Sequence, residues 1–403
     1  MSILIALFGL GLLIFVHESG HFFASLAVGL RPRKFYVGFP PALVKVRRGG
    51  IEYGLGAIPL LGGFVSIPGM HRPIPHDAER RFARAVSEAP ELAGPVERVK
   101  RALAGDDLDL GLVALDALEA AVHGVKLSPP ASSQAEKGIT ELRDGLGPDA
   151  YWKAATWRRL VAIGAGPAAN IVLALVLMTA LFMTSAGKAT SVVASVLASS
   201  PAKASGLQSG DRVLAINGDR VKPSQIAGRI SGSDGKPLRL TVIRNGQKTQ
   251  LKPVAATPRD GAYRLGFVLR GAPLGPIQAV GESFRVTGLV TVEIGRSLAR
   301  LATGTGRKDV SSPIGITQAS SDAVQQGTES YLWVLAIISL SLALMNLLPL
   351  LPLDGGHILF TLIEGARGRF VKREIYERVS VVGLAVVILL FFIGLSNDIG
   401  RLS

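Results

Sequence analysis

Two histidines and a glutamate lie close together in the first apolar stretch of the chain, as His17, Glu18 and His21. Because residues at i and i+4 project from one face of an α-helix, both imidazoles can bind the same tetrahedral zinc ion. Glu18 is adjacent to them and can take a proton from a metal-bound water molecule. Ionisable side chains at bilayer depth are costly, so three of them within an apolar segment indicate a functional site. The motif therefore predicts hydrolytic zinc chemistry at a membrane.

A catalytic zinc site needs a third protein ligand and leaves its fourth position to water. The chain contains no cysteine, so this ligand is a histidine or a carboxylate. The candidates lie at the end of a later apolar run, where Pro349 and Pro352 precede Asp354 and His357. Asp354 is an isolated carboxylate, whereas His357 is the better zinc donor when each residue is considered alone. The residue types leave both candidates open.

Four apolar segments approach or reach the length needed to cross a bilayer: 2–26, 160–185, 331–353 and 379–395. Hydrophobic residues make up 48% of the 403-residue chain, which leaves room for a membrane bundle and for soluble modules. The first segment has no basic residues before it and no convincing cleavage site, so we interpret it as a retained span rather than a signal peptide.

The basic residues indicate how these spans are oriented. No Lys or Arg precedes the first span, whereas Arg31, Arg33 and Lys34 follow it, and the connection 365–378 is also rich in both residues. By the positive-inside rule, loops 31–159 and 365–378 lie in the cytoplasm and both chain ends lie outside. The zinc motif then faces the cytoplasmic side. The net charge of +14 is explained by these flanks, so we expect no nucleic-acid partner.

The regions between the spans differ in composition. Residues 31–71 contain two short β-like runs around Gly49 and Gly50, which predicts a hairpin that dips into the membrane domain. Residues 72–150 are charged and Ala-rich, as in a small helical cytoplasmic insertion or a partly disordered one. Residues 273–330 predict an amphipathic helix, on the membrane or against a neighbouring domain, followed by a linker.

A β-rich region separates the second and third spans. Residues 188–272 contain short apolar runs between Gly, Asn and Asp turns. The stretches 200–207 and 210–218 resemble a bacterial PDZ domain. PDZ domains bind extended peptides by adding a strand to a sheet edge, so this region predicts an extracytoplasmic module with peptide or protein ligands.

Taken together, these motifs resemble a known family. The His-Glu-x-x-His motif, the pattern of Asn346, Pro349, Leu353, Asp354 and Gly355, and a PDZ domain between them are similar to the site-2 proteases. These are intramembrane zinc metalloproteases, and the arrangement is most similar to the bacterial regulator of sigma-E protease type. The stretches 164–170 and 312–316 also resemble that family. The similarity covers nearly the whole chain except residues 72–150.

The resemblance implies a multi-pass α-helical membrane protein. We expect four transmembrane helices, a membrane-associated β-hairpin and an inserted β-rich PDZ domain, in the bacterial inner membrane. One zinc ion per chain would be held by His17, His21 and Asp354, with Glu18 as the general base. The substrates implied are single-pass membrane proteins, such as an anti-sigma factor or remnant signal peptides. Asn346 would hold substrate backbone, and we expect Asn170 to assist it.

Two other functions fit parts of the sequence. A catalytically inactive PDZ scaffold would be expected to lack one member of the set formed by His17, Glu18, His21 and Asp354, but all four are present. A metal-ion transporter would use the same ligands, but transporters usually contain internal repeats, and we find no such symmetry.

Overall fold

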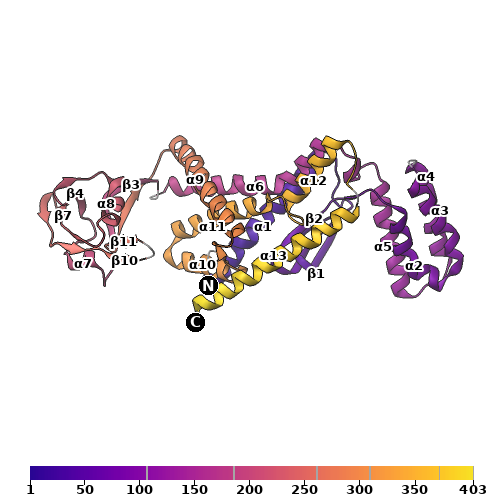
Figure 1. Cartoon of the computed structure of the whole chain (residues 1–403), viewed down its shortest axis with the longest axis horizontal. Helices are drawn as coiled ribbons and strands as arrows, with labels where there is room; N and C mark the ends of the chain where they lie inside the picture. The colour runs from indigo at the N-terminus through magenta and orange to yellow at the C-terminus, as the bar shows by residue number, and fades with distance from the viewer. Residues whose placement is uncertain (106–107, 185–186, 260–261, 308–309, 372, 403) are drawn as a thin grey trace. The chain divides into compact units, whose positions relative to one another are not determined.

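The structure of the chain is a computed structural model, drawn in Figure 1. It describes residues 1–105, 108–184, 187–259, 262–307, 310–371 and 373–402. The chain divides into two compact units. The first comprises Met1–Leu173, Glu293–Gln326 and Ile337–Ser403, and the second comprises Ala174–Val292 and Gly327–Ala336.

Four helices of the described residues are long and apolar enough to cross a membrane: α1 (Ser2–Ala27), α6 (Thr156–Phe182), α11 (Thr328–Asn346) and α13 (Arg373–Leu402). They coincide with the four apolar segments of the sequence. In α13 only 11% of the most apolar stretch is buried, so its Val, Leu and Phe side chains face outward, as contact with lipid requires.

Helix α11 ends at Asn346, although the apolar run continues to Leu353. Pro349 and Pro352 follow, and because proline has no backbone N–H group it cannot continue a helical hydrogen-bond ladder. The next helix, α12 (Asp354–Arg367), begins at Asp354 itself. The helical structure of the third apolar segment therefore ends before Asp354, the candidate metal ligand.

Strands β1 (Lys34–Arg48) and β2 (Ile51–Ser66) pair antiparallel in a two-stranded sheet. Gly49 and Gly50 connect them with φ angles of 60° and 81°, which glycine adopts without a steric penalty. Phe35 of β1 packs edge-on against Phe15 and Phe22 of α1. The sheet thus lies against the helix that carries both histidines.

The described residues between Pro75 and Leu146 are mostly helical. Their helices α2 (Pro75–Glu88), α3 (Ala93–Ala104), α4 (Leu108–Gly124) and α5 (Pro129–Leu146) are accompanied by the 3-10 turns η1 (Pro90–Leu92) and η2 (Tyr151–Lys153). Phe82, Leu115 and Leu118 are fully buried in the core that these four helices share. The apolar residues recur at helical spacing because each helix buries one face.

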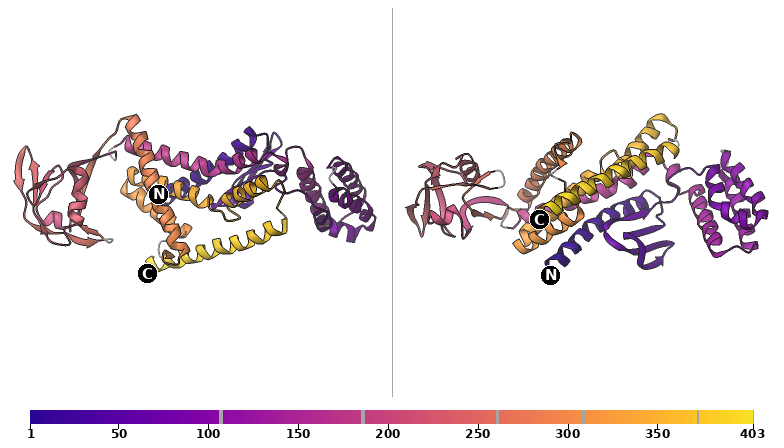
Figure 2. Two further views of the ribbon diagram at one scale, coloured as in Figure 1. Left: turned by 45° about the horizontal axis from the view of Figure 1, so that its top comes forward. Right: turned by 60° about the horizontal axis from the view of Figure 1, so that its bottom comes forward.

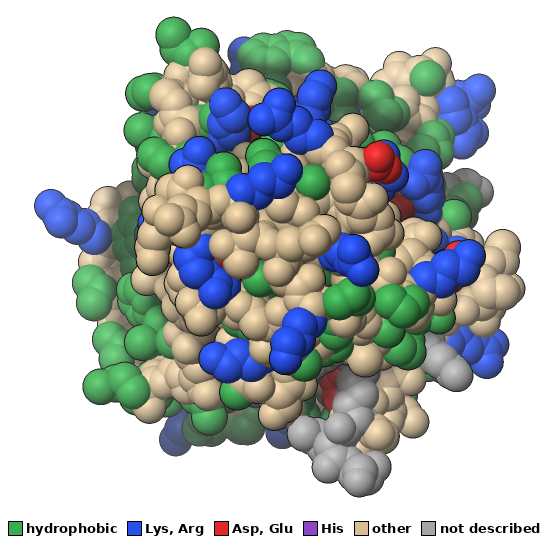
Figure 3. Space-filling model, turned by 90° about the vertical axis from the view of Figure 1, so that its left-hand side faces the viewer, with side chains coloured by type: hydrophobic (Ala, Val, Ile, Leu, Met, Phe, Trp, Pro, Cys, Tyr) green, Lys and Arg blue, Asp and Glu red, His purple; other side chains and the backbone are tan. Residues whose placement is uncertain are grey.

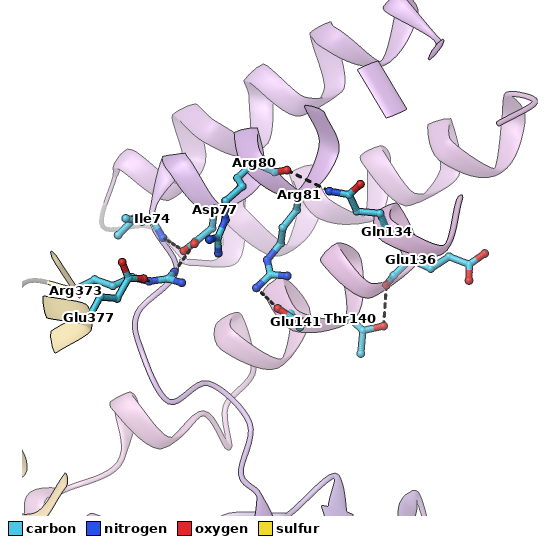
Figure 4. A network of polar contacts seen from close by, with 10 residues as sticks. All are labelled: Ile74, Asp77, Arg80, Arg81, Gln134, Glu136, Thr140, Glu141, Arg373 and Glu377. Atoms are coloured by element: carbon cyan, nitrogen blue, oxygen red, sulfur yellow. Dashed lines mark hydrogen bonds and ion pairs between the residues drawn. The ribbon is translucent and has the colours of Figure 1, made fainter. Parts of the chain in front are cut away.

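An ion pair with a buried carboxylate connects this bundle to the last apolar helix. Asp77 at the start of α2 contacts the guanidinium of Arg373 at the start of α13, and its other carboxylate oxygen accepts from the backbone N–H of Ile74 (Figure 4). The Asp77 side chain is 7% exposed. Arg81 and Glu141 form a second ion pair within the bundle, on its surface (Figure 4).

The region 273–330 contains two helices, α9 (Pro276–Ala302) and α10 (Pro313–Gln326), so α10 occupies part of the expected linker. Helix α10 packs against α1 and α13, and the two chain ends lie near each other (Figures 1 and 2). The buried carboxylate of Asp398 in α13 accepts from Ser312 and from the backbone N–H of Gly315. An α13 carboxylate thus caps the N-terminus of α10.

The second unit contains a β-rich module over residues 188–272. Its six-stranded sheet has the order β12-β3-β4-β7-β8, with β5 paired to β4, and every pairing is antiparallel. The strands of this sheet are β3 (Lys188–Val196), β4 (Arg212–Ile216), β5 (Asp219–Arg220), β7 (Leu240–Arg244), β8 (Gln247–Gln250) and β12 (Phe267–Ala272). The remaining elements are α7 (Pro201–Ala204), α8 (Pro223–Ser231), β6 (Pro237–Leu238), β9 (Val254–Ala255), β10 (Thr257–Arg259) and β11 (Ala262–Arg264).

The module has its own core and a groove. Val193, Leu207 and Leu240 are fully buried in that core. A groove of about 1020 Å³ lies between α8 and the start of β12, which is an edge strand among the described residues, and Ile226 and Phe267 contribute to its lining. Residues 188–272 contain 14 Lys and Arg and four Asp, a net charge of +10. Figure 3 shows a face of the molecule with many basic and few acidic side chains.

Candidate metal centre

Three donor atoms from two distant parts of the sequence converge in the first unit. The Nε2 atoms of His17 and His21 lie 3.2 Å apart, and they lie 3.2 and 3.3 Å from Oδ2 of Asp354. Helix α1 places the two histidines on one face because they are four residues apart. The N-terminus of α12 brings Asp354 to them. Both histidines are buried, at 7% and 6% exposure.

The arrangement fits a tetrahedral zinc ion. Ligand atoms 2.0–2.2 Å from such an ion lie about 3.3 Å apart, which matches the three separations. Oδ2 of Asp354 is buried and receives no hydrogen bond within the described structure. Such an atom is costly unless a cation or a donor faces it. Nitrogen and oxygen donors suit zinc, and three protein ligands leave one position for water.

His21 is held in a defined orientation by α6. Its Nδ1 lies 3.0 Å from the carbonyl oxygen of Ala162, and because a carbonyl only accepts, Nδ1 carries the proton. The Nε2 lone pair of His21 is therefore free for a metal. A Cβ atom at Gly166 would lie 2.2 Å from that Nε2, so the imidazole occupies space that only glycine leaves open. At Gly20 of α1, a Cβ atom would lie 2.4 Å from the carbonyl oxygen of Ala165, so the two helices touch there.

Glu18 is buried between α1 and the β1–β2 sheet. A Cβ atom at Gly63 of β2 would lie 2.7 Å from Cγ of Glu18 and 2.6 Å from the carbonyl oxygen of Tyr36. Strand β2 therefore packs directly on the stem of the Glu18 side chain. The absence of a side chain at Gly63 allows this close approach.

The structure brings Asn170 to the histidines. Asn170 is completely buried, and its amide Nδ2 lies 3.4 Å from Nδ1 of His17. Asn346 is the last residue of α11 and is half-buried. His357, the alternative ligand, does not join the cluster of donor atoms; its Nδ1 contacts the hydroxyl of Tyr376. Burial lowers the pKa of His357 despite the nearby Asp354 carboxylate.

Three residues of this site were not predicted from the sequence: Ala162, Gly166 and Gly63. Gly166 lies in the stretch 164–170 that resembles the site-2 proteases, so its motif was visible, but its role was not. Ala162 acts through its backbone carbonyl, which no residue type reveals. Gly63 belongs to a Gly-Gly pair in an apolar loop, a signal that also fits a simple turn.

The chain is similar over nearly its whole length to a family of known proteins. The sequence model of peptidase family M50 matches residues 5–390, a range that contains all three donor residues and Glu18. Zinc metalloprotease RasP of Geobacillus kaustophilus is 28% identical over 408 residues, covering 97% of this chain and 96% of that protein. Zinc metalloprotease RasP of Bacillus licheniformis is 25% identical over 413 residues, with 97% of each chain covered. From this match over nearly its whole length, the chain belongs to peptidase family M50.

Proposed function

We propose that this protein is a zinc-dependent intramembrane protease that hydrolyses peptide bonds within transmembrane segments of single-pass membrane proteins. The observation that carries the proposal is the location of the donor cluster. Two of its three ligands lie on α1, which is apolar enough to cross a membrane, and the third begins α12, which follows another such helix. A peptidase site at that depth meets the peptide bonds of membrane-embedded segments. Relatives named zinc metalloproteases support the choice of metal and reaction.

Each residue of the site has a proposed role. His17, His21 and Asp354 hold one zinc ion per chain, which when bound acts as a Lewis acid and lowers the pKa of water to about 7. Glu18 accepts a proton from the attacking water molecule, and the oxygen of that water bonds to the peptide carbonyl carbon. Glu18 then donates that proton to the amide nitrogen as the C–N bond breaks, which releases a neutral amine. Asn346 offers its amide to the substrate backbone.

The β1–β2 sheet is proposed to bind the unwound substrate as a membrane-associated hairpin. A transmembrane helix must open before cleavage, and each unpaired backbone group in lipid costs several kcal/mol. In the sheet, residues 34–37 pair with 52–55 on one side and with 63–66 on the other. The segment 63–66 is thus an edge among the described residues, and Gly63 within it adjoins Glu18. A substrate strand added to this edge regains its hydrogen bonds beside the general base.

We propose that residues 188–272 form a PDZ domain that binds an extended peptide or protein segment. The groove between α8 and β12 supports this proposal, since it combines an apolar lining with a strand that is at the edge of its sheet among the described residues. The positive-inside rule places the module outside the cell membrane, both chain ends outside, and the metal centre toward the cytoplasm. The protein would reside in the bacterial inner membrane, where the module selects or docks substrates.

Co-expression with a model single-pass substrate tests the function. The substrate carries a shortened outer domain, and its cleavage is compared between the wild type and Glu18→Gln, with bound zinc measured in both purified proteins. Glu18→Gln should abolish cleavage and keep zinc, because the general base is lost and the three ligands remain. Asp354→Asn should lose both. Ser19→Ala, which removes a half-buried hydroxyl that donates to the backbone carbonyl of Phe15, serves as the matched control next to Glu18.

Three outcomes would contradict the proposal. Cleavage that persists in Glu18→Gln would remove Glu18 from the mechanism. Zinc binding without any cleavage by the wild type, across a panel of substrates, would favour the PDZ scaffold, and zinc uptake into vesicles would favour a transporter.

A further inference from the structure

Helix α6 faces the two histidines of α1 with residues that follow the same spacing. Ala162, Gly166 and Asn170 are four residues apart and therefore lie on one face of α6. The carbonyl of Ala162 accepts from Nδ1 of His21, Gly166 leaves room for its ring, and Asn170 adjoins Nδ1 of His17. Each histidine thus presents its Nε2 to the donor cluster and its Nδ1 to α6.

The two Nδ1 contacts differ in one respect. The Ala162 carbonyl can only accept, so it determines the tautomer of His21. The Asn170 side chain can present either an NH₂ group or an oxygen, which exchange places when the amide rotates by 180°. With the NH₂ group toward His17, the ring must accept at Nδ1 and carry its proton on Nε2. That proton would point toward the donor cluster and prevent metal binding by His17.

We propose that Asn170 is a positioning residue for His17, acting through the oxygen of its amide. After rotation of the amide, Oδ1 accepts a hydrogen bond from Nδ1–H of His17, which leaves the Nε2 lone pair free for the metal. The 3.4 Å separation shortens by about 0.3 Å to reach ordinary hydrogen-bond length. This inference rests on the metal site of the proposed function. It gives Asn170 a role other than the substrate contact expected from the sequence.

Two observations support this role. Oδ1 of Asn170 is buried and has no hydrogen-bond partner within the described structure, although an amide oxygen without a partner is costly. The contact between α6 and α11 does not use the amide, because Ser339 of α11 donates to the backbone carbonyl of Asn170 at 2.9 Å. A role in helix packing alone therefore explains the backbone of Asn170 and leaves its side-chain amide without a function. Metal-bound histidines usually donate their other ring nitrogen to such an acceptor.

Metal affinity measures this role without reference to cleavage. The full-length protein, purified in detergent and stripped of metal, is titrated with Co²⁺, whose visible absorption reports a nitrogen–oxygen ligand set. Asn170→Leu keeps the branched shape of the side chain and removes the acceptor, so the Kd for Co²⁺ should rise by about 10–100-fold. Asn170→Asp restores an acceptor and should bind Co²⁺ within about threefold of the wild type. Ser339→Ala removes only the backbone contact and should leave the Kd unchanged.

The outcomes separate this inference from the proposed function. If Asn170→Leu binds Co²⁺ as tightly as the wild type, the positioning role is wrong while the metal site stands. If the wild type itself does not bind one Co²⁺ per chain, the metal site fails. An equal loss in Asn170→Leu and Ser339→Ala would assign Asn170 to packing. Should Asn170→Leu not accumulate, Asn170→Ala removes the amide without adding bulk and permits the same comparison.

Discussion

Gly166 of α6 touches the metal-facing nitrogen of His21 of α1, since a Cβ atom on Gly166 would lie 2.2 Å from Nε2. The His21 ring must move to relieve this overlap, and its bond from Nδ1 to Ala162 opposes that movement. Glycine at this position is therefore a requirement of the ligand geometry. Gly164 lies two residues earlier in α6, and a Cβ atom there would have no atom within 4 Å.

Gly166→Ala should displace the His21 ring and weaken metal binding by at least about tenfold, with a larger loss of peptidase activity, because catalysis is sensitive to displacements of about 1 Å. Gly164→Ala is the matched control and should change neither quantity. Metal content and cleavage are measured on both purified variants. Equal zinc content in Gly166→Ala and the wild type would show that the site adapts to the added methyl group.

Gly63→Ala should impair the general base, Glu18, without affecting metal binding. The added Cβ meets Cγ of Glu18 and the backbone of Tyr36, so Glu18 or β2 must shift while the three ligands stay in place. We expect zinc content to remain at the wild-type level and the rate of cleavage to fall by about tenfold or more. Gly11→Ala, where no atom lies within 4 Å, is the control. Loss of zinc in Gly63→Ala would contradict the assignment of this contact to Glu18 alone.

The Asp77–Arg373 pair should matter more for stability than the Arg81–Glu141 pair beside it (Figure 4). Arg373→Met leaves a buried carboxylate without its cation and should lower the free energy of unfolding by about 1–3 kcal/mol. Glu141 is 52% exposed, so Glu141→Gln should cost less than about 1 kcal/mol.

Thermal unfolding of the full-length protein in detergent measures both changes. The double variant Asp77→Asn/Arg373→Met should recover part of the loss, because a neutral amide is cheaper to bury than a lone carboxylate. No recovery in the double variant would mean that Arg373 stabilises the bundle through its alkyl chain rather than through its charge.

The β-rich module should lose stability in acid. Burial raises the pKa of Asp211, but hydrogen bonds from Arg244 and from the N–H of Gln208 outweigh it, and the pKa is lowered overall. A lowered folded-state pKa stabilises the fold above the unfolded value and loses that contribution as the pH falls through the folded value. We therefore expect the stability of the module, and with it the protection of its amides from hydrogen exchange, to decline below about pH 4.

Hydrogen exchange over residues 188–272 of the full-length protein, corrected for intrinsic rates, follows this loss. Arg244→Gln should bring the pKa of Asp211 upward, toward or beyond its unfolded value, and should therefore make the decline smaller. A decline of the same size in both proteins would assign the acid sensitivity to other groups.

The net charge of +10 on residues 188–272 should favour acidic ligands in the groove. An apolar peptide flanked by Glu residues is expected to bind full-length protein more tightly than the same peptide flanked by Gln. That difference should shrink as NaCl rises from 50 to about 500 mM, because salt screens the attraction. Fluorescence anisotropy measures both affinities. Equal binding of the two peptides at low salt would show that the basic charge does not act on the groove.

The third metal ligand illustrates how far the sequence leads. Spacing alone places His17 and His21 on one helical face, since the period of the helix is a local property. The choice between Asp354 and His357 depends on where α12 begins relative to α1, and that is not local. The family resemblance points to Asp354, and the structure brings its carboxylate to the histidines while His357 contacts Tyr376.

Local properties of the sequence account for three features of the fold, namely the four membrane-length helices, the paired strands β1 and β2, and the β-rich module. These properties are the length of the apolar segments, the placement of charged residues and the turn residues. Those features depend on properties that each segment carries by itself. The sequence does not predict helix α10 as a separate element, because its capping carboxylate, Asp398, lies in another helix.

Only the tertiary structure decided the contacts made by small or backbone groups. The carbonyl of Ala162, the empty Cβ positions of Gly63 and Gly166, and the amide of Asn170 act because helices and strands distant in the chain approach within van der Waals distance. Close packing makes such contacts specific, and it arises only when the whole unit has folded.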